Sequence, residues 1–324
     1  MNYSKYLLKI HRIPRFLYRI IERKINQLHS FDYPDTSEGW KKYGSKPVYG
    51  DHTTGSIFDP FVFNHNNVYL MYASERNSKS IIRLESTDGI KWKNKAICIN
   101  GSHKNQWDSI INRASVLLNN GIWHMWFTGQ YKDESSIGYA ISTDGIFFHK
   151  VIEAPVLTAN TVYEGKSVMN PCVIWDETDK IYKMWYSAGE QYEPDVICYA
   201  ESKDGISWKR YKNNPIINPI KNNKYEQYKI GGCQVIKSKN QYEMFYIGYQ
   251  NVDVARICQA HSIDGIHWKR ESQNPILSPT RNSWDSDAIY KPTFIRQQDG
   301  SIFLWYNGRK KKNEYIGFAK KKII

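Results

Sequence analysis

A seven-residue phrase recurs four times in this chain, and it constrains the fold more than any other feature. Its first copy is Ser86–Trp92, and the later copies lie at 142–148, 202–208 and 262–268. All four copies begin with Ser and contain Asp-Gly-Ile, and successive aspartates lie 56, 60 and 60 residues apart. A repeat of this length is one supersecondary unit, which must stack on its neighbours to bury a shared core.

Each unit contains the same order of short apolar and aromatic runs. In the first unit these are 59–63, 69–72 and 81–84, followed by the Asp-Gly turn and an aromatic strand. Asp-Gly is a favoured hairpin turn because both positions tolerate positive φ. A fifth unit begins near Pro292 and lacks the turn and the last strand. Four strands per unit and five units predict an all-β fold, a five-bladed β-propeller.

The incomplete fifth unit requires a strand from elsewhere in the chain. The segment from Trp40 to Val48 is the natural candidate, since it precedes the first unit and would close the ring. We therefore expect a basic, helical appendage at 1–30, a linker and propeller-closing segment at 31–56, and the propeller at 57–324.

The appendage carries +6 of the formal net charge of +13. Its apolar residues, such as Phe16, Leu17, Ile20 and Ile21, recur at helical spacing between basic residues, which predicts an amphipathic helix. Such a helix would lie on an anionic membrane surface or pack on the main domain or a second subunit. Nucleic acid is not predicted as a partner, because no nucleic-acid-binding motif accompanies the charge.

The five cysteines are scattered and form no CxxC pair, so we interpret them as reduced core residues. No signal peptide follows the basic start, and no segment is long enough to span a membrane. We expect a cytoplasmic protein, with a peripheral position on the inner face of the cell membrane if the helix binds lipid. No spacing of His, Cys and Asp indicates zinc, and we predict no metal and no cofactor.

The repeated aspartates are interpreted as structural, because Ser, Asp and Gly in a hairpin turn satisfy local backbone groups. Functional residues are expected where the blades converge. In a propeller, the start of each innermost strand and the loop between the second and third strands reach one face near the axis. The residues at these places that we expect to bind substrate are Arg76, Asp108, Asn112, Arg113, Gln130, Asn170, Asp195, Tyr249, Asp287, Lys291 and Arg309.

Two short motifs carry a resemblance to known enzymes. Phe58-Asp59-Pro60 opens the first blade, and Glu164-Gly165 precedes the inner strand of the third. With the predicted architecture over about 47–324, the chain resembles the five-bladed glycosidases of glycoside hydrolase families 43, 32, 62 and 68 and the mannoside phosphorylases of family 130. The resemblance implies that Asp59 is a general base and Glu164 a general acid.

The chain also departs from that pattern. Asn112-Arg113 stands where family 43 has an acid-tuning Asp, and the nearest acid is Asp108. Glu190 and Glu193, in an acidic loop of the third blade, are rival candidates for the acid. Glu164 follows an aromatic residue, as Asp108, Glu226 and Asp285 do in other blades, so this feature could instead belong to the repeat.

Cleavage of a glycosidic bond needs one protonated carboxyl and one carboxylate, and the donor needs a raised pKa. The sequence therefore predicts a carbohydrate-active enzyme, a glycosidase acting on an oligo- or polysaccharide. The cations near the predicted pocket favour an alternative, a glycosyltransferase or phosphorylase of envelope polysaccharide synthesis that uses an activated sugar donor. A non-catalytic glycan-binding propeller is the third possibility, since fold does not determine function.

Overall fold

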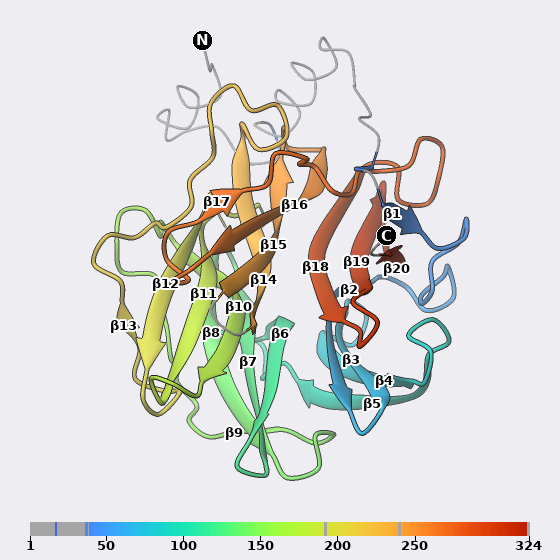
Figure 1. Cartoon of the computed structure of the whole chain (residues 1–324). Coiled ribbons are helices and arrows are strands. Elements are labelled where there is room, and N and C mark those ends of the chain that lie inside the picture. Colours follow the sequence, from blue (N-terminus) through green and yellow to red (C-terminus); the bar gives the residue numbers. More distant parts are fainter. Residues whose placement is uncertain (1–16, 18–35, 38, 191–192, 239–240, 323–324) are drawn as a thin grey trace.

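A computed structural model describes residue 17 and residues 36–37, 39–190, 193–238 and 241–322. Within this part of the chain the named elements are all β-strands, arranged as blades around one centre (Figure 1). No helix among the described residues is long and apolar enough to cross a membrane. The helix expected in the appendage at 1–30 falls almost wholly outside these residues. The all-β five-bladed propeller predicted from the repeat is confirmed.

Each blade is an antiparallel sheet of four strands, numbered here in chain order. The first blade contains β2 (Ile57–His65), β3 (Val68–Glu75), β4 (Ser80–Ser86) and β5 (Lys93–Asn100). The second contains β6 (Ile110–Asn119), β7 (Ile122–Tyr131), β8 (Glu134–Ser142) and β9 (His149–Lys150). The third contains β10 (Ser167–Asp176), β11 (Ile181–Gly189), β12 (Val196–Ser202) and β13 (Lys209–Arg210). The fourth contains β14 (Lys229–Ser238), β15 (Gln241–Tyr249), β16 (Ala255–Ser262) and β17 (Lys269–Arg270).

The fifth blade is built from both ends of the propeller sequence. It contains β18 (Ala288–Arg296), β19 (Ile302–Lys310), β20 (Asn313–Lys321) and β1 (Trp40–Lys42). β1 pairs antiparallel with β20, with Trp40 opposite Lys321, and Tyr49 forms a further bridge to Ile316. The early segment thus supplies the outer strand that the fifth repeat lacks, and this pairing closes the ring.

The Asp-Gly turns hold neighbouring blades together. In each copy of the phrase the Ser hydroxyl accepts a hydrogen bond from the Gly N–H, as Ser202 does from Gly205 at 2.8 Å, and Asp204 Oδ1 accepts two backbone N–H groups. In three copies the carbonyl of the glycine accepts an indole N–H from the preceding blade, as Gly205 does from Trp126 at 2.8 Å, whereas the carbonyl of Gly145 accepts from Tyr72 Oη at 2.8 Å. Gly205 has φ of 75°, which favours glycine, and a Cβ there would lie 2.8 Å from Trp126. The phrase is therefore a structural joint.

The interior is dense in aromatic and sulfur-containing side chains. Trp126, Trp185 and Trp305, from the second strands of three blades, are fully buried, and each donates its indole N–H to a turn glycine of the next blade. All five cysteines are buried and unpaired, as expected for core residues. At the ring closure, where no Asp-Gly turn exists, the Trp40 ring packs edge-on against Phe245 at 5.8 Å instead.

Candidate functional site

Every innermost strand has a β-bulge at the same place, and these bulges define the axial site. In each blade two residues of the inner strand oppose one residue of the second strand. The first residue of each bulge has φ between 39° and 58°; these residues are Asp59, Arg113, Asn170, Gly232 and Lys291. Non-glycine residues rarely adopt such φ values, and bulges re-aim side chains beside active sites. The five equivalent positions thus carry five different chemistries.

The bulges are anchored by hydrogen bonds between blades. The N–H of Arg113 donates to Ser74 Oγ at 3.0 Å, and the N–H of Asn170 donates to Thr128 Oγ1 at 3.0 Å. Gly232 makes the equivalent bond to Ser187 Oγ at 2.8 Å. The second-blade residue of the axial set is therefore Arg113, one position after Asn112. These bonds satisfy buried N–H groups that the bulge removes from the sheet ladder.

Asp59 and Arg113 meet across the first two blades. Arg113 Nε lies 3.3 Å from Asp59 Oδ2, and both side chains are largely buried. The guanidinium is close enough for an ion pair, but Oδ2 accepts no hydrogen bond from the described residues. Burial raises the pKa of Asp59, and the charges of Arg113 and Lys291 only partly offset this. The axis therefore holds a carboxyl group whose protonated form is favoured by its surroundings.

Lys291 brings a second cation to the same place. It is 3% exposed, and burial lowers the pKa of its ammonium group, although the charge of Asp59 acts in the opposite direction. Arg309 lies over the ring of Tyr290 at 5.4 Å and donates to the carbonyl of Asp253 at 2.8 Å. The charges of Arg113, Lys291 and Arg76 each act to lower the pKa of Asp59, against the larger effect of its burial.

Glu314, at the start of β20, is a functional candidate that the sequence analysis missed. It accepts hydrogen bonds from Arg76 and from Asn307 Nδ2, the latter at 3.2 Å, and its charge raises the pKa of Asp59. Arg76 itself is 56% exposed and packs over the Phe58 ring at 4.6 Å. A signal was available, because Glu314 stands two residues before the third-strand isoleucine, as Asp195 does in the third blade.

The acids in the loop of the third blade, Glu190, Glu193 and Asp195, have two kinds of surroundings. Lys229 Nζ lies 2.5 Å from Glu190 Oε2 and 3.2 Å from Asp195 Oδ1, so these two carboxylates share one buried cation. Glu193 is buried, and its charge raises the pKa of Tyr249 and of Tyr290, after the larger effect of burial. Of the three acids, Glu193 is therefore the one placed toward the axial tyrosines.

Glu164 does not have the environment of a proton donor, which corrects the role inferred for it. It is fully buried and accepts hydrogen bonds from Tyr186 Oη at 2.9 Å, Arg210 Nε at 2.8 Å and the backbone N–H groups of Asn160 and Thr161. Burial raises its pKa, but these donors outweigh burial and lower it overall. Both oxygens are occupied, so the group is held as a carboxylate and is closed to substrate.

Glu164 belongs instead to a set that we call the strand-linking acids: Asp108, Glu164, Glu226 and Asp285. Each precedes the innermost strand of its blade and pairs with a cation of the outermost strand: Lys150 at 3.2 Å, Arg210 at 2.8 Å, Arg270 at 2.6 Å and Lys42 at 2.6 Å. Asp108, expected to bind substrate, is 1% exposed. It is thus a structural group, which is the alternative indicated by its recurrence.

The remaining predicted residues make local contacts near the axial face. Asn112 Nδ2 donates to Gln130 Oε1 at 2.7 Å, and Gln130 Nε2 donates to Ser135 Oγ at 3.2 Å. Asn170 Nδ2 lies 3.3 Å from Ser187 Oγ. Asp287 Oδ2 accepts the N–H of Lys311 at 2.6 Å. The buried Asn112–Gln130 pair supports the second blade and does not reach the axial carboxyl, whereas Tyr249, with its ring 6.1 Å from Tyr290, lies beside the axial cluster.

The fold is that of a five-bladed β-propeller with an axial cluster of a carboxyl, cations and tyrosines. Comparison with known proteins takes the assignment further. A family model described as beta-1,4-mannooligosaccharide phosphorylase, that of glycoside hydrolase family 130, matches residues 108–320. Because the match extends over more than half of the chain, the protein belongs to glycoside hydrolase family 130. The family resemblance inferred from the sequence is confirmed.

Individual relatives are more distant. The chain is 29% identical over 194 residues to a beta-1,2-mannobiose phosphorylase of Thermoanaerobacter sp. (strain X514), covering 59% of this chain and 58% of that protein. It is 28% identical over 194 residues to an uncharacterized protein of Mycobacterium tuberculosis, covering 57% of this chain and 60% of the other. The alignments thus span less than two-thirds of these relatives' lengths.

Solved structures share the fold at low identity. A thermostable family-43 glycoside hydrolase matches with a TM-score of 0.66 at 20% identity, covering 81% of this chain and 88% of that one. A family-130 structure, from work on hydrolases that target beta-1,2 mannosidic linkages, matches with a TM-score of 0.66 at 15% identity, covering 90% and 96%. These likenesses establish the propeller fold.

Proposed function

We propose that this protein cleaves a mannosidic bond by phosphorolysis at the axial cluster. The observation that carries the proposal is the approach of Arg113 to one buried carboxyl, Asp59, together with the buried Lys291 at an equivalent bulge, whose charge acts on Asp59. The family description and the named phosphorylase relative support the same chemistry. The sugar and the reaction are inferred from these proteins.

The chemistry assigns a role to each group. Asp59, with its raised pKa, donates a proton to the glycosidic oxygen as the bond from that oxygen to the anomeric carbon breaks. An oxygen of inorganic phosphate attacks the anomeric carbon and forms the new bond, which yields a sugar 1-phosphate. Arg113 and Lys291 would hold the phosphate, since guanidinium and ammonium groups are the usual phosphate partners. Asp59 is thus proposed as the donor, whereas the family resemblance implied a base.

Hydrolysis by the same cluster is the second candidate, favoured by the carboxylates near Asp59. The charge of Glu314 acts on Asp59, and that of Glu193 acts on Tyr249, whose pKa Asp59 also raises. Either glutamate could activate water opposite the donor, as two-carboxylate glycosidases do. Phosphorolysis needs no such base, because phosphate is itself the nucleophile.

One assay separates these possibilities. The purified chain is incubated with β-1,4- and β-1,2-mannobiose, with and without inorganic phosphate, and mannose and mannose 1-phosphate are quantified. Phosphorolysis predicts mannose 1-phosphate only when phosphate is present. Mannose release without phosphate would establish hydrolysis. An Asp59→Asn variant with wild-type turnover would refute the axial assignment. Binding of these sugars without turnover would favour the glycan-binding propeller.

The envelope-synthesis alternative concerns residues 1–30, most of which lie outside the described part of the chain. We propose that this basic segment tethers the enzyme to an anionic membrane, where an activated sugar donor would occupy the same cationic cluster. Cosedimentation with vesicles of phosphatidylglycerol and phosphatidylcholine tests the tether. Loss of vesicle binding on deletion of residues 1–30 would support the tether. A full-length protein that stays in solution and does not sediment with the vesicles would count against it.

A further inference from the structure

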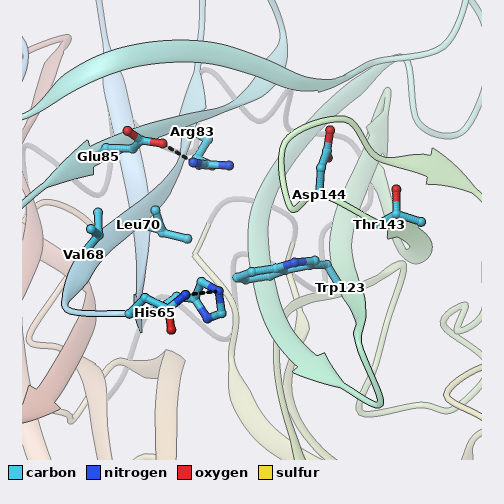
Figure 2. Close-up of a pocket in the computed structure, with 9 residues that line it drawn as sticks. His65, Val68, Leu70, Arg83, Glu85, Trp123, Thr143 and Asp144 are labelled. Atoms are coloured by element: carbon cyan, nitrogen blue, oxygen red, sulfur yellow. Dashed lines mark hydrogen bonds and ion pairs between the residues drawn. The ribbon is translucent and has the colours of Figure 1, made fainter.

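A hollow lies between the first and second blades, on the face opposite the axial cluster. It has a volume of about 420 Å³ and is lined by residues of β2–β4 and their turns on one side and of β7 and the β8–β9 turn on the other (Figure 2). His65 pairs with Val68 at the β2–β3 turn, whereas Asp59 lies toward the other end of β2. The antiparallel register thus separates the hollow from the axial site.

The hollow lies at a junction where three side chains differ from those at the junctions after the second, third and fifth blades. At the junctions after the second, third and fifth blades, a buried Trp packs against a Tyr or Phe on the third strand, at 5.1 Å, 5.4 Å and 5.4 Å. Register places Tyr72 and Arg83 at these two positions in the first blade. The Trp of the next blade's phrase is also replaced, by Phe148. Three substitutions thus set this junction apart from those after the second, third and fifth blades. The fourth blade also lacks the Trp and the Tyr, with Phe245 opposite Gln259, but there Trp40 packs against Phe245.

The walls of the hollow are polar and held in place. Arg83 is buried, forms an ion pair with Glu85 and lies 3.3 Å from the carbonyl of Gly145. Asp144 Oδ1 is held by Ser142 and by the N–H groups of Ile146 and Phe147. Among the described residues, no acceptor meets the indole N–H of Trp123 and no donor meets Asp144 Oδ2. The pocket thus offers a donor and a charged acceptor in fixed positions.

We propose that this hollow is a second saccharide-binding site, which takes a neutral mono- or disaccharide. One guanidinium against two carboxylates leaves the lining with a net negative charge, which disfavours phosphates and acidic sugars. Val68, Leu70 and the rings of His65 and Trp123 supply apolar contact for the C–H faces of a sugar. Ligand pockets range from about 300 to 1,000 Å³, so this one suits one or two sugar rings. The inference is independent of the proposed phosphorolysis.

The test observes Trp123, a side chain that lines the hollow, while sugars are added. The full chain is labelled with 5-fluorotryptophan, the Trp123 resonance is assigned with a Trp123→Phe variant, and β-1,4-mannobiose, glucose, mannose 1-phosphate and glucosamine are titrated by fluorine NMR. We expect a saturable shift of the Trp123 resonance with a neutral sugar. No shift with any neutral sugar, or a shift only with the phosphate or the amine, would overturn the proposal.

Arg83→Tyr is the decisive variant, because it installs the residue that the second and third blades carry. Tyr199 donates to Glu201 at 2.8 Å in the third blade, so a Tyr at 83 can bond Glu85 likewise while its ring fills the hollow. We expect the affinity to fall about tenfold or more, from the loss of volume and of a charged hydrogen-bonding group. Unchanged affinity would refute the site. Tyr72→Trp, which copies Trp126 of the second blade, fills the hollow from the other side and serves if Arg83→Tyr fails to fold.

Two control variants show whether a shift of the Trp123 resonance comes from binding in this hollow. Gln259→Tyr places the same ring at the equivalent position of the fourth blade and should leave the Trp123 shift as in the wild type. Asp59→Asn should also leave it intact, since the axial site lies at the other face. A shift that survives in Asp59→Asn, whether or not the enzyme phosphorolyses mannobiose, keeps this proposal separate from the proposed function.

Discussion

The strand-linking acids and the axial bulges occupy equally regular positions, yet their chemistry follows opposite rules. Asp108, Glu164, Glu226 and Asp285 are all acids and all meet a cation of the outer strand. The bulged positions hold Asp, Arg, Asn, Gly and Lys. Where every blade needs the same joint the residue type is kept, and where one pocket needs several functions it varies. Regular position alone therefore says nothing about catalysis.

The variants Asp59→Asn and Glu164→Gln should show most clearly how the axial bulges and the strand-linking acids differ in catalysis. A general acid contributes about 10²- to 10⁴-fold to the rate, so Asp59→Asn should lower kcat/KM by that factor. Glu164→Gln should leave kcat within about twofold at a temperature where the protein is folded. Steady-state kinetics on mannobiose with phosphate measure both. If Glu164→Gln lost activity while remaining folded, Glu164 would have to be returned to the reaction.

The same two variants should also differ in the free energy of unfolding, with Glu164→Gln now the more affected of the two. Glu164→Gln removes the charge of a fully buried carboxylate that pairs with the half-buried Arg210, and breaking a buried ion pair costs up to about 3–5 kcal/mol. Urea unfolding measures the change, with Glu177→Gln as the control, because the Glu177–Lys180 pair is solvent-exposed and should contribute about 0–1 kcal/mol. Equal midpoints for the two variants would contradict the structural role of the strand-linking acids.

The pH dependence of stability sharpens that test. The pKa of Glu164 is lowered below 4.5 in the folded protein, so its contribution is present at neutral pH and is lost as the pH falls through the folded value. The stability difference between wild type and Glu164→Gln should therefore shrink on acidification below about pH 4.5. A difference that stays constant down to about pH 3 would exclude ionisation of Glu164 as its source.

Lys291→Met tests the axial cluster, with a smaller expected effect on the reaction than Asp59→Asn. Hydrogen bonds to charged groups contribute about 1.5–3 kcal/mol, so loss of the ammonium group should raise the KM for phosphate by about tenfold or more. Stability should not fall, because burial already disfavours the charged form of Lys291. Phosphate titration and thermal unfolding measure the two effects. Arg296→Met, which removes an exposed pair with Glu243, is the control and should leave the phosphate KM unchanged.

The repeated phrase should give the smallest effect. Asp204 Oδ1 accepts hydrogen bonds from Ser202 Oγ and from the N–H groups of Ile206 and Ser207. Asp204→Ala should cost about 1–2 kcal/mol in total, because the turn is exposed and water replaces part of these three hydrogen bonds. Asp144→Ala should cost a similar amount, and neither should change kcat. Thermal unfolding and kinetics of both variants check this, and a loss of catalysis would contradict a phrase that has no part in the reaction.

The sequence by itself determined the propeller, its five-fold register and the segment that closes it. These features follow from local patterns, since turn chemistry, strand periodicity and a fixed repeat length are each visible within about 60 residues. It also placed Asp59, Arg113 and Lys291 near one face. The recurrence of an aromatic-acid pair likewise offered the interpretation that Glu164 belongs to the repeat rather than to the reaction.

Only the tertiary structure decided which of these residues meet. The bulge made Arg113, and not its neighbour Asn112, the axial residue of the second blade, and the fold brought the charge of Glu314, on β20, to act on Asp59. The hollow beside Trp123 arose from three substitutions on two blades. Contacts between blades join residues far apart in the chain and depend on how side chains fill a shared space. No local sequence pattern predicts these contacts. A local pattern indicates the conformation of the backbone, whereas the shape of a pocket depends on side chains from neighbouring blades.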